Sequence, residues 1–362
     1  MSSSLAPPSD SAAPSPQRSP VIPQAGASPR GARFAAELPG HYRVTVEPSG
    51  DSFVVQPGEN ILAAGRRAGV WLPFECGWGS CGTCKATLIS GEVELLFPDA
   101  PAIDPRDDRR RRKLTCQTTT ATNVTLKVTR LGPFEERPTT DRVAQLVDKR
   151  ELGPGICSFT FALDAPADFR PGQYAILELG PDLRRCYSMD AGPGDEITFV
   201  AKHYEGRPGS SALHALKVGV SVPIAIPFGG MWLRDDNSST ILIAGGTGVA
   251  PVLSLVRHMA EQRRTHPVTV LYGANTPEEL VCLDELAAAV AQLPEGELVP
   301  VVAQADDTWE GCRGFATTPL GEIATPAHRY YLAGPPPMVD ATMAVLRECG
   351  AGLDRIHVDK FG

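Results

Sequence analysis

Four of the nine cysteines have a spacing suited to metal binding. Cys76, Cys81 and Cys84 form the pattern Cys-x4-Cys-x2-Cys, and Cys116 follows about thirty residues later. This pattern is typical of plant-type [2Fe–2S] ligation, in which four thiolates hold two irons. The glycines between the first three cysteines would let the backbone approach such a cluster closely. A structural zinc site is the alternative, although zinc sites more often use two short Cys-x2-Cys pairs.

The residues around these cysteines resemble the plant-type ferredoxin domain of bacterial oxygenase reductases. The resemblance covers about residues 42–130 and depends on Trp71-Leu-Pro-Phe-Glu-Cys76 and Leu114-Thr-Cys116. It implies that the four cysteines are the cluster ligands. The basic run at residues 109–113 precedes the last of them. This run is either a solvated helix face or a docking patch for an acidic redox partner.

A second group of residues suits a flavin. Arg185, Tyr187 and Ser188 form an Arg-x-Tyr-Ser sequence on a predicted strand. A flavin needs a cation for its phosphate, a flat aromatic ring against the isoalloxazine and a hydroxyl near the ring N5, and these residues offer all three. Gly209 and Ser210 open a predicted short helix at residues 210–216, whose N-terminus could bind a pyrophosphate.

These flavin elements resemble, in their order, the FAD domain of the ferredoxin–NADP reductase superfamily over residues 142–234. The resemblance implies that Arg185, Tyr187 and Ser188 contact the flavin and that Gly209 and Ser210 contact its pyrophosphate. It favours FAD over FMN, because FMN-using reductases of the phthalate type carry their ferredoxin at the C-terminus. The alternative is that Arg185 and Tyr187 only decorate a barrel surface.

A glycine-rich turn predicts a nicotinamide site. A predicted strand at residues 241–244 runs into a turn and then a helix, an arrangement that cradles a pyrophosphate. The turn has the pattern Gly-x-Gly-x-x-Pro, which is the form found in the same reductase superfamily. The residues predicted to bind the dinucleotide here are Gly245, Gly246, Thr247, Gly248 and Pro251.

Gly334 and Pro335 belong to a second turn that resembles the family's Cys-Gly-Pro-Pro-Pro-Met sequence beside the nicotinamide. Ala333 stands where the family has cysteine, which predicts a modest cost in hydride-transfer rate. No cation occurs from residue 271 to 286, so NADH is predicted over NADPH. Phe361 resembles the family's terminal aromatic residue near the flavin, and it is equally compatible with a core phenylalanine. With Ser188, it is the predicted catalytic position.

The predicted elements place these groups in a multidomain α+β and α/β protein. Residues 1–40 contain eight proline, eight serine and eight alanine residues and predict a disordered tail. A β-grasp ferredoxin domain is expected at 41–131, a linker at 132–141, an antiparallel β-barrel FAD domain at 142–235 and a parallel-sheet α/β NAD domain at 236–362. In the last region strands alternate with helices, including one predicted at 276–290.

Composition narrows the function. The 34 basic and 42 acidic residues give a net charge of −8, which argues against nucleic acid as a partner, and no apolar run could span a membrane. The scattered cysteines indicate a reducing, cytoplasmic compartment.

The residues and the resemblance together predict an NADH-dependent reductase that passes electrons through FAD and a [2Fe–2S] cluster to a terminal oxygenase. That oxygenase is either a diiron monooxygenase or a Rieske dioxygenase, and the domain order with Trp309-Glu-Gly311 slightly favours the diiron group. A reductase of the same layout serving a deoxysugar dehydrase is the alternative within this class. A non-catalytic redox sensor or a zinc-stabilised adaptor is the alternative outside it.

Overall fold

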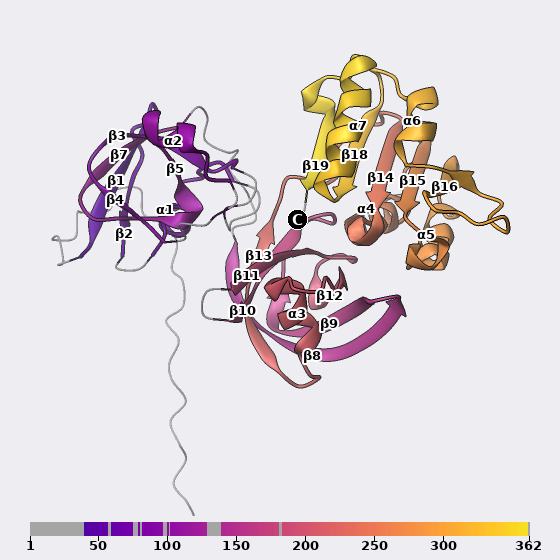
Figure 1. The fold of residues 1–362 in the computed structure, drawn as a ribbon, viewed down its shortest axis with the longest axis horizontal. Helices are drawn as coiled ribbons and strands as arrows, with labels where there is room; N and C mark the ends of the chain where they lie inside the picture. Colours follow the sequence, from indigo (N-terminus) through magenta and orange to yellow (C-terminus); the bar gives the residue numbers. More distant parts are fainter. Residues whose placement is uncertain are drawn as a thin grey trace, which may run out of the picture. The chain divides into compact units, whose positions relative to one another are not determined.

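The computed structural model describes residues 40–56, 59–74, 79, 82–96, 100, 102–128, 139–180 and 183–360. Three larger sheets follow one another along the chain, and Figure 1 shows them in indigo, in magenta and in orange to yellow. No helix in these ranges is long and apolar enough to cross a membrane. The predicted tail and the predicted linker at 132–138 lie outside the described residues.

The first sheet is small and mixed. Its strand order is β2-β1-β7-β3-β5, with β1 parallel to β7, and β4 pairs with β6 in a separate two-stranded antiparallel sheet. Helix α1 begins after Asn60, whose side chain accepts a hydrogen bond from the Ala63 amide as a helix cap. The elements are β1 (Tyr42–Glu47), β2 (Ser52–Val55), α1 (Ile61–Arg67), β3 (Lys85–Ser90), β4 (Val93–Leu95), α2 (Pro105–Arg109), β5 (Arg112–Leu114), η1 (Thr115–Gln117), β6 (Thr118–Thr120) and β7 (Val124–Lys127).

The second sheet is antiparallel and closes into a barrel. Its order is β11-β10-β13-β8-β9-β12, and a bridge between Met189 and Phe199 joins its two edges. Strand β8 begins at Thr140, inside the segment predicted as linker, because residues 140–145 pair with β13. The elements are β8 (Thr140–Gly153), β9 (Ile156–Ala167), β10 (Tyr174–Gly180), β11 (Leu183–Ser188), β12 (Gly194–Lys202), α3 (Pro208–Ala215) and β13 (Ser221–Phe228).

The third sheet is parallel, with the order β17-β16-β15-β14-β18-β19. Helices α4 and α5 cover one face and α6 and α7 the other, so β14 is buried on both sides and its sequence is continuously apolar. The elements are β14 (Thr240–Gly245), η2 (Gly246–Gly248), α4 (Val249–Glu261), β15 (Val268–Ala274), η3 (Pro277–Glu279), α5 (Leu283–Val290), β16 (Gly296–Val302), β17 (Cys312–Arg313), α6 (Thr317–Ile323), β18 (Arg329–Gly334), α7 (Pro336–Glu348), η4 (Leu353–Arg355) and β19 (Ile356–Lys360).

The helix predicted at 276–290 is wrong in its first half. Residues 277–279 form only a 3₁₀ turn, and α5 begins after Cys282, which has a left-handed φ of 55°. The buried Tyr272 hydroxyl donates to the Val281 carbonyl over 3.0 Å, which holds residues 280–282 against the strand. This tertiary contact overrides the helical pattern of the local sequence.

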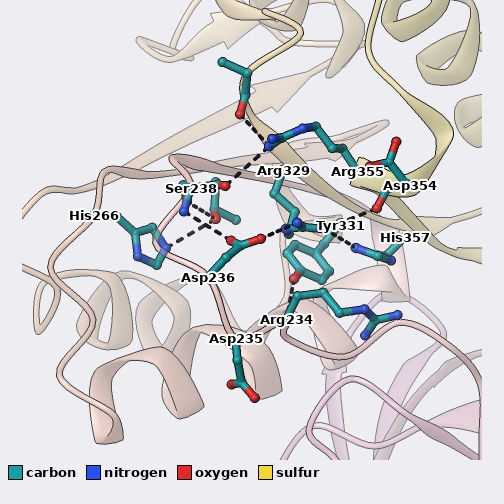
Figure 2. A network of polar contacts seen from close by, with 12 residues as sticks. Arg234, Asp235, Asp236, Ser238, His266, Arg329, Tyr331, Asp354, Arg355 and His357 are labelled. Atoms are coloured by element: carbon teal, nitrogen blue, oxygen red, sulfur yellow. Dashed lines mark hydrogen bonds and ion pairs between the residues drawn. The ribbon is translucent and has the colours of Figure 1, made fainter.

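A polar network holds the segment that connects the barrel to the parallel sheet. The guanidinium of Arg329 pairs with Asp236 and lies 3.0 Å from Nε2 of His357, while the Arg234 amide donates to the Tyr331 hydroxyl over 3.0 Å (Figure 2). Burial and the neighbouring Arg234 and Arg329 lower the pKa of His357 to about 3, so this imidazole is neutral. The network lies where β14 and β18 begin, at the opposite end of these strands from the glycine turns.

Candidate functional site

Two of the four predicted metal-binding cysteines lie together in the described structure. Cys84 precedes β3 and Cys116 lies in η1; both are buried, and their sulfur atoms are 3.2 Å apart. The Thr115 hydroxyl donates to the Cys84 carbonyl over 3.1 Å and so joins the two segments. Cys76 and Cys81 lie outside the described residues.

The Cys84–Cys116 geometry fits shared metal ligation. A disulfide needs a sulfur separation of about 2.05 Å, whereas two thiolates on one tetrahedral metal with bonds of about 2.3 Å lie roughly 3.7 Å apart. Gly79, which lies between the first two predicted ligands, is tightly packed, because a Cβ there would lie 2.9 Å from side-chain atoms of both Ala100 and Gln117. Gly79 has a φ of +96°, which a residue with a side chain rarely adopts. The residue type at this position therefore follows from both the space and the backbone conformation.

The basic run beside this loop carries partly balanced charge. Asp107 pairs with Lys85 over 2.6 Å and Asp108 pairs with Lys113 over 2.8 Å. These contacts neutralise both carboxylates next to the run. The side chains of Arg109 and Arg110 are exposed, so the positive charge of these two residues faces solvent.

The predicted phosphate-binding residues of the flavin motif come from two elements that meet. Arg185 lies on β11, and its side chain passes over the first turn of α3: a Cβ at Gly209 would lie 2.3 Å from the Arg185 Nε. Only glycine permits this approach, which explains the residue type. The Ser210 hydroxyl accepts from the Tyr204 amide over 3.0 Å, so it braces its own loop.

The other two flavin residues differ in their surroundings. The Tyr187 ring lies 6.0 Å from the Phe199 ring, and burial raises the pKa of the Tyr187 phenol, which stays protonated at neutral pH. The Ser188 hydroxyl donates to the Asp359 carboxylate, which is buried on β19. This hydrogen bond joins the barrel to the parallel sheet. Asp359 was not predicted from the sequence, where its only signal is an acidic residue two positions before Phe361. Phe361 lies outside the described residues.

Loss of the Ser188 hydroxyl is expected to slow flavin reduction by NADH. In Ser188→Ala the buried Asp359 carboxylate has one partner fewer, a change worth about 1–3 kcal/mol and hence a roughly 10–100-fold lower rate. Stopped-flow measurement of flavin bleaching at saturating NADH checks this. Ser188→Thr, which keeps the hydroxyl, is the matched control, and equal rates in Ser188→Ala and the native protein would contradict the expectation.

The two predicted nicotinamide turns lie side by side. Strands β14 and β18 are parallel neighbours with Ala244 opposite Ala333, so their C-terminal ends bring Gly245 next to Gly334. The chain order of the sheet reverses between these two strands, and open α/β sheets bind ligands at such a position. Pro335 caps the start of α7 beside this crevice.

The glycines of the first turn serve two purposes. A Cβ at Gly248 would lie 2.1 Å from the Ala333 carbonyl oxygen, and one at Gly245 would lie 2.3 Å from the Met338 sulfur. Both glycines therefore allow close packing of the two turns. Gly246 differs, since the space beside it is open and its φ is +53°, and Thr247 is half-exposed. Pro251 is buried in the first turn of α4.

The end of β15 holds the polar groups nearest to the predicted cofactor-discriminating segment. Tyr272 is fully buried within the strand and cannot meet a ligand there. Asn275 follows the strand and donates to Glu279 over 3.2 Å, and Glu279 pairs with Lys202 of β12 over 2.5 Å. Lys202 lowers the pKa of Glu279 despite its burial, so the carboxylate is ionised. Residues 271–286 contain no cation of their own. The cation that reaches them is Lys202 of the barrel, and it is already paired with Glu279.

We expect kcat/KM for NADH to exceed that for NADPH by about tenfold or more, since an extra phosphate carrying about two negative charges would meet no free cation in residues 271–286, and Lys202 is already paired with Glu279. Steady-state reduction of an artificial acceptor with each nucleotide measures this ratio. Glu279→Gln should narrow it, because the carboxylate is then gone. A higher value for NADPH would overturn the prediction.

The half-buried carboxyl group of Asp190 lies at the contact between α4 and the barrel. Arg257 of α4 donates to the Asp190 carbonyl over 3.0 Å, and Ser254 donates to the Ala191 carbonyl over 2.8 Å. Burial raises the pKa of Asp190 to about 6, which Arg257 only partly opposes. The folded state therefore holds this proton more tightly than the unfolded state does.

Stability should accordingly fall as the pH rises from about 4, where the unfolded carboxyl ionises, to about 6, where the folded one does. We expect Asp190→Asn to gain about 2 kcal/mol relative to the native protein at pH 7 and to gain nothing at pH 4. Thermal unfolding of both proteins at the two pH values checks this. An equal difference at both pH values would contradict it.

Two family models match the chain. A 2Fe-2S iron-sulfur cluster binding domain matches residues 44–121, and an oxidoreductase NAD-binding domain matches residues 242–344. The first match covers Cys84 and Cys116, and the second covers both glycine turns. Together with the fold, they define an iron–sulfur, nicotinamide-linked oxidoreductase.

Relatives and solved structures extend the likeness over most of the chain. The reductase component of phenol 2-monooxygenase from a Pseudomonas species is 33% identical, covering 85% of this chain and 90% of its own length. The ferredoxin–NAD(+) reductase component of the Xanthobacter autotrophicus alkene monooxygenase system is also 33% identical, with coverages of 86% and 98%. The structure of a ferredoxin reductase in carbazole 1,9a-dioxygenase matches with a TM-score of 0.79 at 29% identity, covering 89% of this chain and 98% of the other.

The chain belongs to the family of ferredoxin–FAD–NAD reductase components of bacterial oxygenase systems. It is an oxidoreductase whose cofactors are a [2Fe–2S] cluster, FAD and NADH, and whose electrons go to a terminal oxygenase. This confirms the fold class, the cofactors and the kind of partner predicted from the sequence.

Proposed function

We propose that the chain is the reductase of a hydrocarbon- or phenol-oxidising diiron monooxygenase. The first two relatives named above serve phenol and alkene monooxygenases, which supports this choice. An Amycolatopsis cytochrome P450 reductase also matches, with a TM-score of 0.79 at 26% identity, so the fold is compatible with several acceptors. Trp309 packs against Gly311 in its own turn, and the preference for a diiron acceptor drawn from this segment stays a prediction.

The proposal assigns the cofactors to residues. Cys84 and Cys116, with Cys76 and Cys81, would hold the cluster. The flavin would lie along β11 against Tyr187 and Ser188, with Arg185, Gly209 and Ser210 at its phosphates. The dinucleotide would bind at the ends of β14 and β18, using residues 245–248, Pro251, Gly334 and Pro335. The limits 41–131, 142–235 and 236–362 for the three domains are part of the same proposal.

The hydrogen bond from Ser188 to Asp359 carries this assignment, because it joins the proposed flavin strand to the sheet that ends in the nicotinamide crevice. When bound, NADH supplies a hydride, FAD accepts the electron pair and the cluster passes the electrons on singly. The chain's own contribution is to position the two carriers: Ser188 and Asp359 fix the barrel edge against the sheet, and Gly245 and Gly248 let the two turns close on each other. No side chain needs to act as a general base in a direct hydride transfer.

The cysteine usage supports a cytoplasmic location as part of the proposal. The exposed Arg109 and Arg110 near the cluster loop favour an acidic docking surface on the oxygenase. A reductase that serves a deoxysugar dehydrase would have the same domain layout. The relatives named above are reductase components, which favours an enzyme over a non-catalytic adaptor.

Anaerobic titration of the purified protein with NADH tests the proposal. We expect flavin and cluster absorption bands that both bleach, followed by NADH-dependent hydroxylation when a diiron hydroxylase of the phenol or alkene type is added. A protein whose spectrum does not respond to NADH would refute the enzyme. A protein that bleaches but supports only a Rieske dioxygenase would refute the choice of partner.

A further inference from the structure

Arg66 of α1 connects the first sheet to the barrel. Its guanidinium carbon lies 3.9 Å from the centre of the Phe228 ring at the end of β13, and 5.4 Å from the Phe74 ring. The rings of Phe74 and Phe228 meet edge to face, with centres 5.3 Å apart and an interplanar angle of 89°. One cation and two aromatic rings thus form a single contact between two regions distant in sequence.

The surroundings of Arg66 strengthen its interaction with the Phe228 ring. Phe228 is buried, Arg66 is half-buried, and the Nε of Arg66 is buried with no hydrogen-bond partner among the described residues. Burial lowers the pKa of Arg66 to about 10, and Asp141 on β8 and Tyr174 partly oppose this, so the side chain stays charged at neutral pH. A desolvated cation over an aromatic face interacts more strongly than an exposed one.

The contact borders an open space. A cavity of about 270 Å³ lies between α1 and the barrel, lined by residues that include Asn60, Ala63, Arg66, Asp141 and Phe228. Arg66 and Phe228 are thus the residues that meet where this space closes, and their contact joins α1 to β13 at its edge.

The contact lies between the proposed cluster loop and the proposed flavin strand. Phe74 is two residues before Cys76 in the sequence. On the barrel side, Phe228 pairs with Tyr174 in the sheet and their rings are stacked with centres 5.7 Å apart, and Tyr174 in turn pairs with Ser188. A change in how α1 sits on β13 would therefore change the separation of the two proposed redox sites.

We propose that Arg66 is a positioning residue that holds the ferredoxin-type region on the barrel and so sets the rate of electron transfer from flavin to cluster. This inference rests on the proposed function, because it needs the flavin and the cluster at their proposed places. The contacts of Arg66 that carry this role are those with the Phe228 and Phe74 rings, so its effect acts through these two residues.

The test compares Arg66→Ala with two matched variants. Arg66→Lys keeps the charge but loses the flat guanidinium, and Arg67→Ala truncates the neighbouring arginine, whose 2.7 Å ion pair with Glu59 lies within the first sheet. Stopped-flow absorption and rapid-freeze EPR follow flavin reduction by NADH and then cluster reduction. We expect Arg66→Ala to leave flavin reduction within about twofold and to slow cluster reduction about tenfold, the loss expected for one desolvated cation–π contact. Arg66→Lys should recover part of the rate, and Arg67→Ala should match the native protein.

Hydrogen exchange provides a readout that does not depend on turnover. In the native holoprotein we expect α1 and residues 221–228 to be protected together, and in Arg66→Ala both should exchange faster while the parallel sheet is unchanged. Cluster reduction and exchange that are both unaltered in Arg66→Ala would overturn the inference, as would an equal effect of Arg67→Ala. A native protein whose flavin is not reduced by NADH would instead refute the proposed function, and the exchange experiment would still decide whether Arg66 holds the interface.

Discussion

Replacing Cys84 with serine is expected to remove the metal centre and to lower NADH-driven reduction of a protein acceptor by more than about a hundredfold. The Cys84 sulfur is buried 3.2 Å from that of Cys116, and the described residues contain no group of three or more His, Cys, Asp or Glu side chains that could hold the metal instead. A serine hydroxyl does not ionise at neutral pH and is a poor ligand for iron. Iron analysis, the visible spectrum and acceptor reduction measure the loss.

Flavin reduction by NADH should survive in Cys84→Ser, because Cys84 lies beside the first sheet, while Ser188 and Asp359 lie in the other two and the glycine turns follow strands of the third. Cys312→Ser is the matched control: this cysteine is half-buried on β17 of the parallel sheet and should be replaceable without loss of iron. Native acceptor reduction in Cys84→Ser would rule out this cysteine as a ligand.

Replacing Gly248 with alanine is expected to have the second large effect, this time on the nicotinamide crevice. The new Cβ would lie 2.1 Å from the Ala333 oxygen and 2.6 Å from its carbonyl carbon, and these backbone atoms belong to a central strand that cannot move aside. Overpacking of this kind costs about 1–3 kcal/mol of folding free energy. Because the clash separates the two turns, we also expect KM for NADH to rise by about tenfold or more.

Thermal unfolding and the NADH dependence of flavin reduction test Gly248→Ala, with Gly321→Ala as the control. Gly321 lies in α6 with no atom within 4 Å of the site of its Cβ, so alanine there should be neutral or slightly stabilising. If Gly248→Ala binds NADH as the native protein does, NADH binding does not depend on the close packing of Gly248 against the Ala333 backbone.

Much of the fold could be predicted from local patterns. Alternating residues around a Ser-Gly-Asp turn indicate the strand at 42–47 and its hairpin partner, and the apolar Ile61, Leu62 and Ala64, which fall on one side of a helix, indicate α1. The alternation of strands and helices after residue 240 predicted the parallel sheet, because strands that alternate with helices are joined by crossovers. The helix at 276–290 failed because the Tyr272 hydroxyl, a tertiary partner, holds residues 280–282 out of it.

The candidate site also has residues that could be predicted from the sequence and residues that could not. The chemistry of the cysteines, of Arg185, Tyr187 and Ser188, and of the glycine turns is carried by residue type and short spacing, which are properties of the sequence itself. Asp359 escaped prediction because its role depends on a partner 171 positions away. The ion pair of Lys202 with Glu279 could not be predicted either, because the two residues meet only after the barrel and the parallel sheet have both formed.

The sequence alone therefore determined which cofactors this protein can hold, because ligand spacing and glycine turns are local features that work over a few residues. Only the tertiary structure decided how the cofactor regions are joined: Ser188 to Asp359, Lys202 to Glu279 and Arg66 to Phe228. Each of these contacts joins residues from two different regions of the fold. Such pairs produce no local pattern in the sequence, because each contact depends on how two separately formed surfaces meet.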